Sequence, residues 1–167
     1  GRSVEVASRI GFQKILAAHS FTWLGVQTMF VYMFAYLQDK YQDMSADDLG
    51  EGISIAFLIL NAVAAVLPAL LLDPIALRQG RVRTHTFCLA AMTLGYLGIL
   101  YYGADSLLSI NLMMAVVGVG WAATVSLPFA IMSQKVDKTQ MGLYMGLFNL
   151  SVVLPQLVAS LGIGELI

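Results

Sequence analysis

Two side-chain amides, Asn149 and Gln156, lie seven residues apart in the apolar stretch GLYMGLFNLSVVLPQLVAS, residues 142 to 160. Seven residues are about two helical turns, so both amides fall on one stripe of a helix. The remaining residues on that stripe are mostly small: Gly142, Gly146, Val153 and Ser160. Uncharged amides can bind the hydroxyl groups of a ligand or bond to a neighbouring helix, and both interpretations stay open for this stripe.

Other apolar stretches place amide and aromatic side chains at similar helical spacing. Aromatic rings offer apolar faces for a sugar ring to stack on, and amides supply hydrogen bonds without fixed charge. Structural alternatives exist, because interhelical amide bonds and an interfacial belt of aromatic residues use the same groups. We predict that the following residues line a cavity for a neutral, polyhydroxylated ligand: Gln27, Tyr32, Asn61, Trp121, Asn149 and Gln156.

The composition is that of a membrane protein. Hydrophobic residues make up 59% of the 167 residues and charged residues 11%, and the mean hydropathy is +0.79, outside the usual range of soluble domains. The net charge of −1 gives no basic field of the kind that attracts nucleic acid. A single cysteine, Cys88, and the absence of metal-ligand spacing or enzyme motifs predict no metal, no cofactor and no enzymatic activity.

Apolar runs of about 20 residues, the length that crosses a bilayer, predict the elements that position these groups. The fold class expected is an all-α, polytopic transmembrane bundle, with residues 1–19 as a cytoplasmic or interfacial segment and residues 20–167 as the bundle. His19 and His85 fall at the ends of spans, where we expect them at the membrane interface. The five predicted spans are residues 20–38, 52–72, 84–102, 107–132 and 141–163.

The cations indicate the orientation of the chain. Cytoplasmic loops of membrane proteins carry an excess of Lys and Arg. Lys40 lies in the acidic loop after the first span, whereas the other eight of the nine cations lie on the opposite side of the predicted bundle. That side is therefore predicted to be cytoplasmic, in the inner or plasma membrane. Its cations are Arg2, Arg9, Lys14, Arg78, Arg81, Arg83, Lys135 and Lys138.

Two apolar segments and one loop resemble a known family. GLFNLSVVLPQLVAS and the preceding VSLPFAIMS are similar to the sucrose transporters and their relatives, in the glycoside-pentoside-hexuronide cation-symporter branch of the major facilitator superfamily. The loop ALRQGRVRTH is similar to the short cytoplasmic loop of that superfamily, with Arg78, Gly80 and Arg81 matching its basic-glycine-basic pattern. It departs from the pattern at Leu77, where an acidic residue is usual, and the nearest carboxylate is Asp73.

The resemblance implies a function and a set of partners. It aligns the chain with helices seven to eleven of a twelve-helix transporter, lacking the amino-terminal bundle and the twelfth helix. It implies half of a secondary active transporter that moves a disaccharide or related glycoside, with proton symport, by alternating access. The partners would then be the sugar, protons, the bilayer and the amino-terminal bundle. The alternative is a small integral-membrane interaction protein that uses its polar stripes to pack against another protein.

Overall fold

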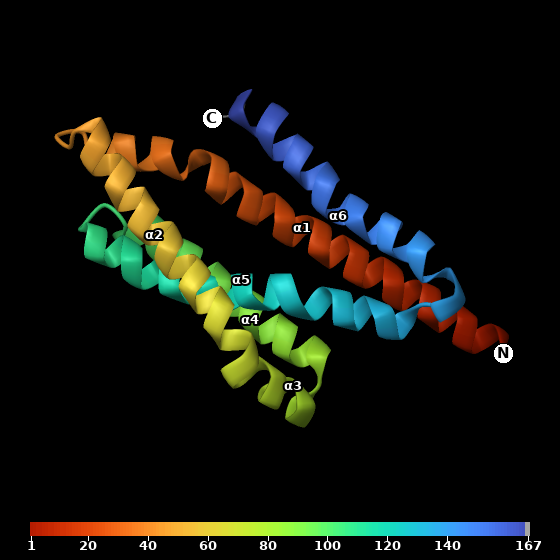
Figure 1. Cartoon of the computed structure of the whole chain (residues 1–167). Coiled ribbons are helices and arrows are strands. Elements are labelled where there is room, and N and C mark those ends of the chain that lie inside the picture. Colours follow the sequence, from red (N-terminus) through yellow and green to blue (C-terminus); the bar gives the residue numbers. More distant parts are fainter. Residues whose placement is uncertain (166–167) are drawn as a thin grey trace. The chain divides into compact units, whose positions relative to one another are not determined.

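A computed structural model describes residues 1–165, and every regular element in that range is helical (Figure 1). The expected all-α class is therefore confirmed. The long helices are α1 (Arg2–Lys40), α2 (Ala46–Leu67), α4 (Arg81–Tyr102), α5 (Leu107–Lys135) and α6 (Met141–Leu161). The short ones are a π-helical segment η1 (Pro68–Leu72), α3 (Asp73–Gln79), and the 3₁₀ turns η2 (Lys138–Gln140) and η3 (Ile163–Glu165).

Four helical runs are long and apolar enough to cross a membrane: Ala46–Gln79, Arg81–Tyr102, Leu107–Lys135 and Lys138–Leu161. They match four of the five predicted spans, of which the last, 141–163, extends two residues beyond Leu161. The first predicted span, 20–38, is helical but lies inside the 39-residue helix α1, which is not among these four. Its polar residues, including Gln27 and Thr28, lower its mean hydropathy. Helix α1 also runs without a break through residues 19 and 20, where we expected a lead-in segment to end.

Local chemistry explains several helix boundaries. Ser45 accepts a hydrogen bond of 3.1 Å from the Asp48 backbone N–H and so caps α2. At the end of α2, Pro68 has no N–H for the regular helical bond, and the Asp73 N–H bonds to the Pro68 carbonyl in the wider π pattern. Gly80 joins α3 to α4 with φ of 92°, a left-handed conformation that disfavours any side chain.

The chain divides into two compact units, which are described separately. The first contains residues 1–32 and the chain from residue 128 onward. Within it α1 and α6 lie side by side and run in the same direction, because contacts recur in order along both helices (Figure 1). The Phe12 and Tyr144 rings meet edge to face at 5.1 Å, and further along the helices the rings of His19 and Phe148 stack at 4.7 Å.

The second unit contains residues 33–127, with α2, α4 and most of α5. Helices α4 and α5 approach closely at glycines. A Cβ atom on Gly120 would lie 2.2 Å from Met92 Cβ, and one on Gly95 would lie 3.0 Å from the Val117 backbone nitrogen. Both glycines are buried. These small residues allow the two backbones to pack, as they do in membrane helix pairs generally.

Candidate functional site

The structure brings together two predicted site residues of the second unit, Asn61 of α2 and Trp121 of α5. The Trp121 indole N–H donates a hydrogen bond of 3.2 Å to Asn61 Oδ1. The Asn61 amide group in turn donates a 2.9 Å bond to the Phe57 carbonyl one turn earlier. Asn61 is exposed and Trp121 is half-buried. The pair therefore presents an amide in a fixed orientation beside an aromatic ring, both within reach of a ligand.

In the first unit, the polar stripe of α6 lies on a face that is largely accessible. Asn149 is exposed and Gln156 is half-buried. The buried face of α6 consists instead of Phe148, Ser151, Pro155 and Ala159. A shallow hollow of about 420 Å³ is lined by Asn149 and Gly146 together with Phe129, Met145, Phe148 and Val152. An amide at the wall of an otherwise apolar hollow suits a ligand with both hydroxyl groups and apolar faces.

Gly142 and Gly146 do not mark a close helix contact among the described residues. A Cβ atom added to either glycine would meet nothing within 4 Å. Two glycines at this spacing favour close helix approach in membrane proteins generally. Within the described chain this face of α6 is open.

The two remaining predicted site residues lie on α1 in the first unit. The Tyr32 hydroxyl donates a hydrogen bond of 3.1 Å to the carbonyl of Ala159. Ala159 lies in the last turn of α6, whose carbonyl groups lack regular helical partners, so Tyr32 satisfies one of them. Tyr32 thus has a structural role in joining α1 to α6. Gln27 is half-buried on the same helix.

Sequence reasoning missed the buried histidines. His19 and His85 were expected at the membrane interface, but only 3% and 4% of their surfaces are exposed. The Trp23 indole N–H donates a 2.9 Å bond to His19 Nε2, and the His19 ring stacks on Phe148. The four-residue spacing of His19 and Trp23 was the available signal.

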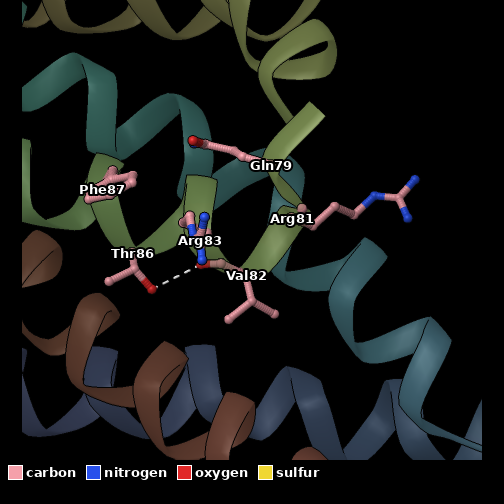
Figure 2. Close-up of a pocket in the computed structure, with 7 residues that line it drawn as sticks. Gln79, Arg81, Val82, Arg83, Thr86 and Phe87 are labelled. Atoms are coloured by element: carbon pink, nitrogen blue, oxygen red, sulfur yellow. Dashed lines mark hydrogen bonds between the residues drawn. The ribbon is translucent and has the colours of Figure 1, made fainter. Parts of the chain in front are cut away.

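The predicted loop motif forms the turn between α3 and α4 (Figure 2). Arg78 lies in the last turn of α3, Gly80 makes the turn, and Arg81 begins α4. The Thr84 hydroxyl donates a 2.8 Å bond to the Gly80 carbonyl, and Gln79 donates a 3.2 Å bond to the Thr84 oxygen. Thr84 is buried, so these bonds hold the turn in one conformation.

The four long apolar helical runs define an integral membrane protein. Residues 3–160 match the family model of the Major Facilitator Superfamily, and the chain therefore belongs to this family of membrane transporters. No group of three or more potential metal ligands occurs in the described part of the chain.

One curated relative is the sucrose transport protein SUC4 of Arabidopsis thaliana. The chain is 33% identical to it over 76 residues, which cover 44% of this chain and 15% of the plant protein. The chain thus spans a small part of the length of that relative. No solved structure matches.

Proposed function

We propose that this chain forms the carboxyl-terminal half of a secondary transporter that moves a disaccharide or related glycoside by alternating access. The observation that carries this proposal is the Asn61–Trp121 pair, an oriented amide beside an aromatic ring on accessible surface. Amide–hydroxyl bonds and ring stacking are two interactions by which proteins recognise uncharged sugars. Membership of the superfamily and the similarity to a sucrose transport protein support the same substrate class.

In this proposal the candidate residues have unequal roles. Asn61, Trp121 and Asn149 are accessible and would contact the sugar directly. Gln27 and Gln156, like Trp121, are half-buried, and within the first unit they would supply further amide groups. Tyr32 would shape the cavity by fixing α6, since its hydroxyl group already bonds to Ala159.

Proton symport requires a group whose charge changes within the membrane. The carboxylates of the chain lie in loops or at helix ends, at the following positions: Glu5, Asp39, Asp43, Asp47, Asp48, Glu51, Asp73, Asp105, Asp137 and Glu165. We therefore place the carboxylate of a proton-coupled cycle in the amino-terminal bundle, which would be the partner of this chain in the complete transporter.

The test is sugar uptake by the complete gene product in proteoliposomes. Sucrose and maltose are offered with and without an inward proton gradient. We expect uphill uptake of at least one of them only with the gradient. Uptake that is equal with and without the gradient would support a sugar transporter but contradict proton coupling. No uptake of any glycoside in a wider panel would contradict the proposal as a whole.

Site variants make the test specific. Asn149→Leu and Asn61→Leu are expected to raise the KM for sugar about tenfold or more, because each removes hydrogen bonds to the substrate. Gln140→Leu is the matched control, since Gln140 is an exposed amide that makes no capping bond at the start of α6. Equal KM values for Asn149→Leu and Gln140→Leu would show that Asn149 does not belong to the sugar site.

The alternative, an interaction protein without transport activity, is favoured by one observation. The stripe with Gly142 and Gly146 is open on α6, as a surface that packs against another helix would be. Gly142→Leu and Gly146→Leu would then abolish co-purification of a membrane partner, and the unaltered protein would show no sugar uptake. In a transporter, the same changes would alter uptake itself.

A further inference from the structure

We propose that the turn between α3 and α4 binds the phosphate headgroup of an anionic phospholipid in the membrane leaflet that it faces. A hollow of about 530 Å³ lies at this turn. Figure 2 shows its lining residues, which come from the end of α3 and the first two turns of α4. They are Gln79, Gly80, Arg81, Val82, Arg83, Thr86 and Phe87.

The charged side chains that line the hollow are all positive. Arg81 and Arg83 belong to its lining, Arg78 lies just before it on α3, and no lining residue is acidic. All three arginines are exposed, and none is in an ion pair with any residue between positions 1 and 165. A guanidinium group binds phosphate through paired N–H donors, so each of these arginines is complementary to a phosphate group.

The position of the arginines strengthens this inference. The amino-terminal end of a helix carries partial positive charge, which disfavours cations there. Yet the first turn of α4 has Arg81 and Arg83 and no acidic residue. The negative charge of a bound phosphodiester would offset part of this positive charge. The neutral polar groups are already engaged, because Gln79 bonds to Thr84 and Thr86 donates a 2.9 Å bond to the Val82 carbonyl. Among the lining side chains, the arginines therefore have the most donors left for a ligand.

The apolar side chains indicate a lipid in preference to a free anion. Val82 and Phe87 line the hollow and are 56% and 60% exposed, and Leu77 beside it is 84% exposed. A soluble phosphate would gain nothing from these side chains. A phospholipid places its acyl chains beside its phosphate, so one molecule contacts both the arginines and the apolar wall.

The expected orientation agrees with this ligand. The turn lies on the side with eight of the nine cations, which is predicted to be cytoplasmic. Anionic lipids give the cytoplasmic leaflet its negative surface potential, and each nearby cation adds to the attraction. The proposal needs only that the chain is inserted in a membrane, and it does not depend on the sugar transport proposed above.

The experiment measures lipid retention on the complete gene product. The protein is purified in detergent with phosphatidylglycerol or phosphatidylcholine, and bound lipid is counted by native mass spectrometry. We expect retained phosphatidylglycerol but not phosphatidylcholine. Arg81→Gln with Arg83→Gln should weaken this retention about tenfold or more. Arg2→Gln with Arg9→Gln is the matched control, with the same charge change at another place on the same expected side, and should leave retention unchanged.

Two further variants test the apolar wall and the charge of the hollow separately. Phe87→Ser should weaken phosphatidylglycerol retention, and Arg81→Lys with Arg83→Lys should preserve most of it, because the charge remains. If the glutamine variant does not fold, the lysine variant tests the proposal in its place, because it should still retain phosphatidylglycerol in preference to phosphatidylcholine. Equal retention by the glutamine variant and its control would overturn the proposal. So would displacement of the lipid by glycerol phosphate at equal concentration, because that result describes a free-anion site.

Discussion

The Trp121 indole N–H donates a 3.2 Å hydrogen bond to Asn61 Oδ1, across sixty positions of sequence. The Asn61 amide also donates to the Phe57 carbonyl, and these two bonds fix the plane of the amide. One N–H and one lone pair of the amide then remain for a ligand. The pair has two functions in this structure, since it links α2 to α5 and presents a hydrogen-bonding edge at the surface.

The first prediction separates these two functions. Trp121→Phe keeps an aromatic ring but removes the donor, so we expect a loss of about 0.5–1 kcal/mol of folding stability, the low end for an accessible hydrogen bond. Asn61→Ala removes the amide altogether and should raise the KM for sugar more than Trp121→Phe does. The two quantities are read from thermal unfolding and from uptake kinetics. Loss of stability with unchanged KM in both variants would make the pair purely structural.

The second prediction concerns Tyr32, whose hydroxyl bonds to the Ala159 carbonyl. Tyr32→Phe should destabilise the protein by about 0.5–1.5 kcal/mol and increase hydrogen exchange in the last turn of α6, because a helix-end carbonyl loses its partner. Tyr101→Phe is the control, since Tyr101 is 72% exposed. Similar exchange in the two variants would show that the Tyr32 bond does not hold this helix end.

The third prediction uses two helical glycines with opposite surroundings. Gly120→Ala would place a Cβ atom 2.2 Å from Met92 Cβ and 2.9 Å from the Cys88 carbonyl, so the α4–α5 contact must separate. A loss of about 1–3 kcal/mol or more is expected. Gly146→Ala meets open space and should be neutral or stabilising by up to about 1 kcal/mol, because alanine favours helix. Thermal unfolding of both variants in the same detergent makes the comparison.

The fourth prediction is the orientation of the loops. In a Cys88→Ala background, Asp43→Cys should react with a membrane-impermeant thiol reagent in intact cells, whereas Lys138→Cys should react only after the membrane is opened. Asp43 and Lys138 are both exposed, so accessibility within the protein does not bias the result. Native Cys88 is buried, which makes its replacement a precaution against slow background labelling. The opposite labelling pattern would reverse the predicted topology.

The sequence predicted where the helices lie better than it predicted which face of each helix is buried. Hydropathy located four of the spans because long apolar runs have few alternatives to a membrane helix. It did not identify Phe148, Ser151, Pro155 and Ala159 as the buried face of α6. In a bilayer, lipid-facing and protein-facing residues are equally apolar, so periodicity shows where polar groups lie but not which face packs.

Contacts between residues far apart in the chain also could not be predicted from the sequence alone. Asn61 and Trp121 were selected for their chemistry, but nothing in their separate segments indicates that they bond to each other. The burial of His19 was missed for a related reason: its position at the end of a predicted span gave no sign of a packing partner, whereas the helix continues to Arg2 and the ring packs against Phe148.

The π-helical segment Pro68–Leu72 sets the rotation about the helix axis between two proposed sites on the continuous helical run Ala46–Gln79. Its bond from the Asp73 N–H to the Pro68 carbonyl encloses one residue more than an α-helical turn does. Each residue turns an α-helix by about 100°, so this extra residue rotates everything after it relative to the Asn61 face. Removing one residue from the segment would preserve both helices and both side-chain clusters, yet point Arg78 and the α3–α4 turn toward a different part of the membrane.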